Sequence, residues 1–291
     1  MTDGCRVSGI GYRVSAVPSP RPAALIRPSG RSIARLIGIG SVLLLVAGWV
    51  AQDPPPRYTA AMLANASFDQ RLRAEVSTQA GGAARSERIG RDARLELRVT
   101  RGDTALALEA WFDSLDIWRD GPEGRVAPDP DAVIGGRYRG VLAPDGALMV
   151  NTRPFLPDEL IEVTDLAEAL HEFLPRLPRV ALAPGGVWQD AGFRIVRRTD
   201  STAAGVPLQR YRWRRLQADT VEQGLTDSLR YLVRSELDQE GDLVWHATRG
   251  PLVWRQRSSV RMEIPADGPV QRAARTQMTE EIWVWQRLAP P

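Results

Sequence analysis

The residues whose side chains could carry out chemistry are few, and their spacing matches no catalytic motif. The chain has two histidines, His171 and His246, one cysteine, Cys5, and 35 acidic residues. No metal-ligand spacing joins the two histidines, so a zinc site is not expected. There is no Gly-x-Ser-x-Gly elbow, and a Ser-x-x-Lys motif cannot occur because all 38 basic residues are arginine.

Glycines and carboxylates give no stronger signal. Gly38-Ile39-Gly40 lies inside an apolar run and lacks the third glycine of a phosphate-binding loop. Asp158 and Glu159 are neighbours, but no acidic pair stands out from ordinary surface charge, and a glycosidase-type pair is defined by its spacing in space. His171 beside an apolar stripe is typical of a boundary residue. We therefore expect a protein that is not an enzyme and that holds no cofactor and no metal.

One segment is predicted to form an amphipathic helix. Asp165 is placed to cap it, and Glu168 three residues later completes a capping box. Pro175 and Pro178 end it. Its apolar stripe repeats at spacings of three and four and consists of Val163, Leu166, Leu170, Phe173 and Leu174.

Around this helix the apolar residues repeat with a period of two, which predicts strands. Segments 89–99 and 104–112 flank Arg101-Gly102-Asp103, and segments 137–142 and 147–150 flank Ala143-Pro144-Asp145-Gly146. Both pairs are predicted hairpins. A third hairpin is predicted where 229–237 and 243–246 flank residues 238–242.

The end of the chain carries Ile282-Trp283-Val284-Trp285, which is apolar on both faces and predicts a strand covered on both sides. About ten strands and one helix are expected in all. The predicted fold is mainly β, a curved antiparallel sheet of half-barrel or sandwich-like form. The central helix buries its stripe on the concave face, and a membrane helix precedes the sheet. The residues expected to line an apolar pocket, or alternatively to fill a closed core, are Leu166, Leu170, Phe173, Trp188, Trp213 and Trp254.

One stretch indicates a location. Residues 36–51 read LIGIGSVLLLVAGWVA without a charge, and Arg31 and Arg35 precede them. As a helix this run measures about 24 Å, and adding Ile33 and Ala34 brings it close to the roughly 30 Å hydrocarbon core. The predicted membrane segment contains Leu36, Leu43, Leu44, Leu45, Val46 and Trp49.

Three interpretations of this run stay open: a single-pass anchor, a cleaved secretory signal and a buried core helix. Trp49 stands two residues before Ala51 and makes a poor cleavage site there, whereas Val46 and Gly48 form a tolerable pair. A lipoprotein is not expected, because Cys5 lies upstream of the run. The six arginines and one acid before the run predict a cytoplasmic N-terminus and an extracytoplasmic body.

The sequence thus divides into four parts: a basic, disordered cytoplasmic tail (1–32), a membrane anchor or signal segment (33–52), a linker with a short helix (53–66) and an extracytoplasmic antiparallel β-domain (67–291). The expected location is the inner membrane with this domain in the periplasm, or the periplasm alone after cleavage. Without Asp3 and the six arginines that precede the apolar run, the formal net charge of +3 becomes about −2, so no nucleic-acid partner is expected.

The order of elements between residues 68 and 288, strands followed by one helix and further strands, resembles the LolA-like and LppX-like half-barrel carriers of the bacterial envelope. That resemblance implies an open barrel whose apolar hollow takes a lipid or acyl chain beneath the helix. Membrane lipid is then the expected partner. A retained anchor would instead favour a tethered lipid-binding protein. The alternative is an accessory subunit of an integral-membrane complex, because tryptophan and arginine are enriched at interfaces and the chain has nine tryptophans.

Overall fold

Long strands with alternating apolar and polar side chains make up most of this protein. The structure is a computed structural model that describes residues 54–102, 105–203, 205–224, 230–266, 270 and 272–287, all within one unit, Gln52–Pro291. The strands are β1 (Ser67–Ala80), β2 (Ala83–Arg101), β3 (Leu106–Gly121), β4 (Gly124–Val126), β5 (Tyr138–Leu142), β6 (Leu148–Thr152), β7 (Val187–Asp190), β8 (Phe193–Arg197), β9 (Ser201–Ala203), β10 (Val206–Gly224), β11 (Arg230–His246), β12 (Gly250–Ile264) and β13 (Ala274–Arg287). The helices are α1 (Ala60–Leu63), α2 (Asp158–Ile161) and the 3-10 turn η1 (Ala169–Glu172).

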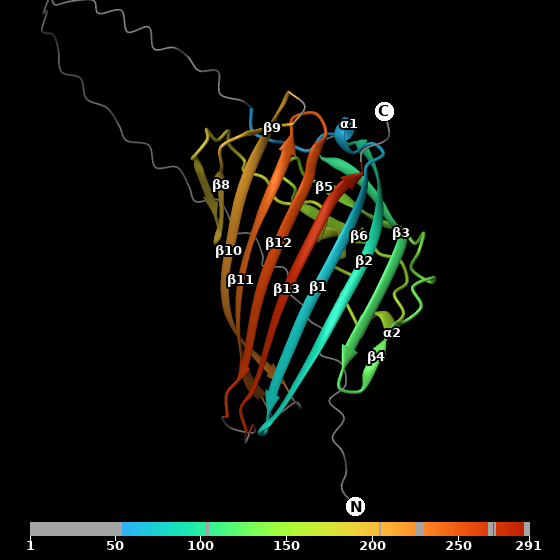
Figure 1. Cartoon of the computed structure of the whole chain (residues 1–291), viewed down its shortest axis with the longest axis vertical. Coiled ribbons are helices and arrows are strands. Elements are labelled where there is room, and N and C mark those ends of the chain that lie inside the picture. The colour runs from blue at the N-terminus through green and yellow to red at the C-terminus, as the bar shows by residue number, and fades with distance from the viewer. Residues whose placement is uncertain are drawn as a thin grey trace, which may run out of the picture. The chain divides into compact units, whose positions relative to one another are not determined.

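These strands form one curved antiparallel sheet (Figure 1). Its order is β6-β5-β3-β2-β1-β13-β12-β11-β10-β8-β7, with β4 beside β3 and β9 beside β10. The first and last strands therefore pair at the centre of the sheet, where Ser67 lies opposite Arg287. The predicted curved antiparallel sheet is confirmed, with 13 strands where about ten were expected.

The segment between β6 and β7, residues 153–186, links the two edges of the sheet and packs on its concave face. Phe173 meets Phe112 of β3 with ring centroids 6.3 Å apart. The Tyr138 hydroxyl donates to the carbonyl of Leu166 at 3.0 Å, and the Trp254 indole donates to the carbonyl of Glu172 at 2.7 Å. The prediction that this segment buries its apolar residues on the concave face of the sheet is thus confirmed.

The predicted central helix itself is wrong: this segment contains only α2 and the single turn η1. Asp165 does cap, since its carboxylate accepts from the amides of Ala167 and Glu168 at 2.8 and 3.3 Å. No long helix follows, because side chains of the sheet bond to the carbonyls of Leu166 and Glu172, which a helix would use internally. Tertiary bonding therefore overrides the helical pattern.

Two of the three predicted hairpins are confirmed. Strands β2 and β3 pair across residues 102–105, and β5 pairs with β6 across the turn at 143–147. The third hairpin is wrong, because β11 runs unbroken through residues 238–242. Its acidic residues Asp238 and Glu240 pair with arginines of β10 at 2.7 and 2.8 Å, which stabilises an extended strand where a turn was expected.

The prediction that β13 is covered on both faces is wrong for the described residues. Ile282 and Val284 point into the concave face and are buried, at 0% and 2% exposure. Trp283 and Trp285 point to the convex face and are 38% and 37% exposed. The guanidinium of Arg255 lies over the Trp283 ring, 4.3 Å from its centroid, so an exposed cation forms the partial cover.

The apolar run at 36–51, with all six predicted membrane residues, and the tail before it lie outside the described residues. Among the described helices, none is both long and apolar enough to cross a bilayer.

Candidate functional site

The register of the strands divides the concave face into two halves. In the half nearer α1, the central row runs from Arg91 through Leu72, Ile282 and Gln256 to Gly241 and Trp213, and every member is buried. The segment between β6 and β7 covers this half with buried apolar residues. We call it the closed half, and it holds the hydrophobic core.

Two residues further along the strands lies a polar row, which we define as Glu280, Ser258, Gln239 and Arg215. These residues are cross-strand neighbours on β13, β12, β11 and β10. Ser258 is buried and the other three are half-buried. The polar row marks the border of the closed half.

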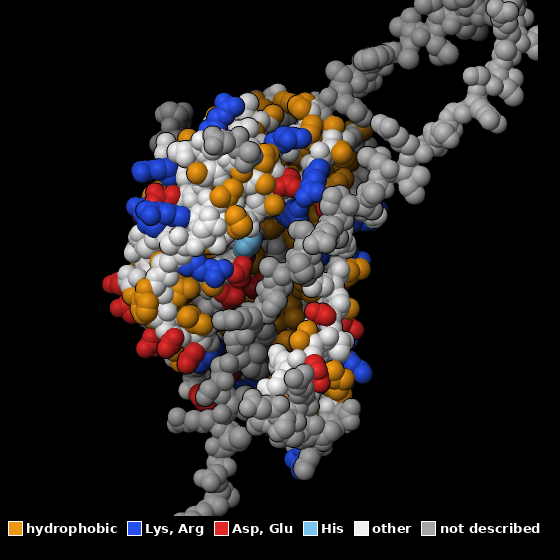
Figure 2. Space-filling view, turned by 180° about the vertical axis from the view of Figure 1, so that it is seen from behind, with side chains coloured by type: hydrophobic (Ala, Val, Ile, Leu, Met, Phe, Trp, Pro, Cys, Tyr) orange, Lys and Arg blue, Asp and Glu red, His pale blue; other side chains and the backbone are white. Residues whose placement is uncertain are grey.

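Beyond the polar row lies the open half of the face. Its first row is apolar across four central strands and consists of Val76, Met278, Val260 and Leu237. Met262 and Ile264 of β12 extend it toward the far end of the sheet. All six are half-buried. Figure 2 looks onto this side of the sheet and shows a hollow with hydrophobic side chains inside it.

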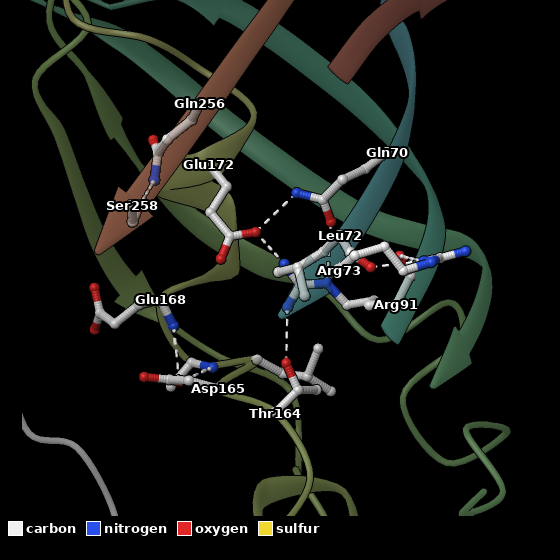
Figure 3. A network of polar contacts seen from close by, with 12 residues as sticks. Gln70, Leu72, Arg73, Arg91, Thr164, Asp165, Glu168, Glu172, Gln256 and Ser258 are labelled. Atoms are coloured by element: carbon white, nitrogen blue, oxygen red, sulfur yellow. Dashed lines mark hydrogen bonds and ion pairs between the residues drawn. The ribbon is translucent and has the colours of Figure 1, made fainter. Parts of the chain in front are cut away.

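A buried arginine is at the centre of the polar contacts behind this border (Figure 3). Arg91 has no exposed surface. Its guanidinium donates to Gln70 at 3.0 Å, to Thr164 at 3.3 Å and to the carboxylate of Glu172. Gln70 in turn donates to Glu172 at 2.7 Å. These bonds fasten η1 to β1 and β2, so the arginine and Glu172 compensate each other's charge inside the closed half.

Burial raises the pKa of Glu172, while the charge of Arg91 and the hydrogen bonds from Gln70 and Arg91 oppose that increase. The Glu172 side chain retains 21% exposure. With Gln70 and Arg91 both donating to its Oε2, this carboxylate is the better compensated of the two acidic groups near the border.

Glu280 is the second acidic group, and its surroundings differ. Within the part of the chain that the structure describes, no residue hydrogen-bonds or forms an ion pair with its carboxylate. Burial, with a further contribution from the negative charge of Glu172, raises the pKa of Glu280 to about 7, against the opposing charge of Arg91. The border therefore carries a carboxylate that takes up a proton near neutral pH.

Next to Glu280 in the polar row are the hydroxyl of Ser258 and the amide of Gln239, and the amide of Gln256 reaches Ser258 from the adjoining central row. The amide groups of Gln239 and Gln256 both donate to the Ser258 hydroxyl, at 3.3 and 3.0 Å. The indole N–H of Trp213, which is buried above Gly241, has no acceptor among the described residues. The row therefore presents hydrogen-bonding groups beside an apolar surface, as ligand sites commonly do.

The residues predicted to face a pocket are all found in the closed half or at its edge. Leu166, Leu170 and Phe173 are at most 1% exposed, and Trp213 and Trp254 are each 5% exposed. The two indoles stack with centroids 5.7 Å apart. Trp188 is half-buried against Phe193 at 6.4 Å. In this structure five of the six residues belong to the hydrophobic core and Trp188 packs against it, and the open half lies beyond them.

Sequence reasoning missed Arg91 and Glu280. The signal that could have revealed them is a charged residue at one of the alternate strand positions that are otherwise apolar. Met278, Glu280, Ile282 and Val284 alternate along β13 on one face, so Glu280 is the exception in that phase. No group of metal-binding side chains occurs among the described residues.

Comparison with known proteins adds little. No protein-family model and no curated protein matches the chain. A DUF1329 family protein from Desulfovibrio piger is 10% identical over 77% of this chain and 87% of its own, with a TM-score of 0.14. An outer membrane lipoprotein-sorting protein domain from Vibrio parahaemolyticus is 10% identical over the same shares, with a TM-score of 0.13. Neither likeness supports an inference about what this chain binds.

Proposed function

We propose that this chain is a non-enzymatic, membrane-anchored or exported protein whose extracytoplasmic β-domain binds a lipid or another apolar ligand on the open half of its concave face. The observation that carries the proposal is the contrast between the halves. The same face of the same strands is fully buried on one side of the polar row, and on the other side it presents apolar side chains that no described segment covers.

The dimensions of the open half suit an acyl chain. Glu280 lies six positions along β13 from its first residue, Ala274, which corresponds to about 20 Å of strand. The floor along this length consists of Val, Leu, Ile and Met side chains with intervening Thr and Ser. Methionine and branched aliphatic side chains accommodate a flexible chain by packing, without specific polar contacts.

Val260→Arg tests the proposal, with Ser259→Arg as its control. Val260 points into the open half, and Ser259 is the next residue on β12 and points to the convex face. The full chain is purified in mild detergent, lipids that co-purify are identified by mass spectrometry, and binding of a fluorescent fatty-acyl probe is titrated.

Val260→Arg should lower the probe affinity at least tenfold, because a guanidinium at this half-buried position would replace part of the apolar surface. Ser259→Arg should bind like the wild type. Circular dichroism checks that both variants keep their strands. If Val260→Arg binds lipid and probe as well as the control does, the open half is not the binding surface.

A second function is favoured by the exposed Trp283 and Trp285 on the convex face. Paired exposed indoles beside arginine are typical of a protein interface. In an accessory subunit of an integral-membrane complex this surface would be covered by a partner. The same mild-detergent purification separates the two functions, since a subunit should elute in a large stoichiometric complex and a lipid-binding protein should elute alone with lipid.

A further inference from the structure

The charges at the border between the two halves do not balance. One guanidinium, that of Arg91, is close to two carboxylates, those of Glu172 and Glu280. Arg91 contacts Glu172 directly, with Gln70 and Thr164 completing its hydrogen bonds. Ionised Glu280 would therefore be an extra negative charge at a half-buried position, which costs free energy unless a proton or a cation joins it.

The strands on either side supply no cation. The residues directly opposite Glu280 are Ala74 on β1 and Ser258 on β12. The nearest cation in the polar row is Arg215, three strands away, and its guanidinium donates to Gln217 at 2.7 Å. Among the described residues, the charge of Glu280 can be matched only by Arg91, which Glu172 already neutralises.

The polar row and Gln256, which adjoins it in the central row, also have an excess of hydrogen-bond acceptors. The amide nitrogens of Gln239 and Gln256 both donate to Ser258. Among the described residues, none donates a hydrogen bond to the amide oxygens of these two side chains. Together with the carboxylate of Glu280, the row offers several acceptors next to each other. An ammonium group, with three N–H donors and no acceptor, is the chemical complement of this set.

These acceptors lie next to the apolar side chains of the open half. Met278 and Val260 of the open half lie two residues beyond Glu280 and Ser258 on the same strands, about 7 Å away. A ligand with its head at Glu280 would therefore lay its chain along the open half.

We infer that the open half binds an amphiphile with a primary ammonium head, held by the carboxylate of Glu280 and the amide oxygens of Gln239 and Gln256. This inference rests on the proposed function and adds to it the chemistry of the headgroup. Both a free long-chain amine and a phospholipid with an amine head carry this group.

The experiment compares tetradecylamine with tetradecanol and tetradecanoate, each competing with the fluorescent acyl probe on the full chain in a fixed amount of non-ionic detergent. Glu280→Gln is the test variant. Glu281→Gln is the matched control, because Glu281 is its neighbour on β13 but faces the convex side, where it pairs with Arg255. Liposomes of phosphatidylethanolamine and of phosphatidylcholine, offered as lipid donors, distinguish an amine phospholipid from a free amine.

At pH 8 the wild type should bind the amine at least tenfold more tightly than the alcohol. Glu280→Gln should abolish that preference, and Glu281→Gln should keep it. Since Glu280 titrates near pH 7, protons compete with the ammonium, and the amine affinity of the wild type should fall about tenfold between pH 8 and pH 6. Arg91 and Glu172 are the charged groups near this carboxylate, and Glu172 also titrates. The amine affinity of Glu280→Gln should not change with pH, which identifies Glu280 as the group that takes up the proton.

Equal binding of amine and alcohol by the wild type, or an amine preference that survives in Glu280→Gln, would refute the ammonium site while leaving lipid binding intact. Preferential binding of the fatty acid would also refute it, since Glu280 would then act as a neutral donor. If none of the three probes binds, the proposed function fails together with this inference.

Discussion

Replacing Arg91 with methionine tests whether the closed half depends on one buried ion pair. Arg91 is fully buried and bonds to Glu172, Gln70 and Thr164. Methionine keeps most of the aliphatic stem and removes the charge, so the main change is a carboxylate at Glu172 that has lost its cation.

The expected loss follows from the burial of that carboxylate. Breaking a buried ion pair by removing one partner costs about 3–5 kcal/mol. Because the Glu172 side chain keeps 21% exposure, the lower end applies, and Arg91→Met should lower the free energy of unfolding by about 3 kcal/mol. Without Arg91 the pKa of Glu172 rises further, so the deficit is greatest above that pKa and shrinks as falling pH protonates the carboxylate.

Urea unfolding of the full chain, followed by tryptophan fluorescence at about pH 7.5 and pH 5, measures this difference. Arg88→Met is the control, because Arg88 is on the same strand but forms its ion pair with Asp120 at 69% exposure, where a pair is worth less than about 1 kcal/mol. Arg91→Met/Glu172→Gln should recover part of the loss. If Arg91→Met is as stable as Arg88→Met, the ion pair does not hold the closed half together.

Two further predictions concern single positions. The pKa of Glu280 rises from 4.5 to about 7 on folding. The folded state therefore binds a proton that the unfolded state has lost, and the free energy of unfolding should fall as pH rises from about 4.5 to about 7. Glu280→Gln should remove this pH dependence and raise the free energy of unfolding of the ligand-free protein by about 1–3 kcal/mol at pH 8, as measured by urea unfolding. Gly90→Ala should cost about 1–3 kcal/mol, because its new Cβ would lie 2.3 Å from the Trp118 ring; the cost should drop in a Trp118→Leu background, and an equal cost in both backgrounds would contradict the clash.

The strands were predictable because their pattern is local. Along β2 the apolar residues Leu95, Leu97 and Val99 alternate with charged ones, and period-two alternation leaves little choice of fold class. The course of residues 238–242 was not predictable, since Asp, Gln, Glu and Gly together are also typical of a turn. Their strand conformation depends on arginines of β10, and local sequence does not specify that pairing.

The candidate site was harder to predict from the sequence for the same reason. Arg91, Glu172 and Glu280 come from three distant parts of the chain. The register of β2, β1 and β13 sets Arg91 and Glu280 near each other, and the packing of η1 on the concave face brings Glu172 to Arg91. A sequence can mark Arg91 and Glu280 as charged residues at positions of a strand that are otherwise apolar. It cannot show which of them lacks a partner.

The pairing of β1 with β13 also bears on how the protein matures. The strand made first must wait for the strand made last before the middle of the sheet has all its hydrogen bonds. Until then two long hydrogen-bonding edges stay unpaired in the nascent chain and offer templates for misassembly. Loss of β13 would leave β1 and β12 with unpaired edges at the centre of the sheet, so an unfinished chain should depend on chaperones until β13 has been synthesised.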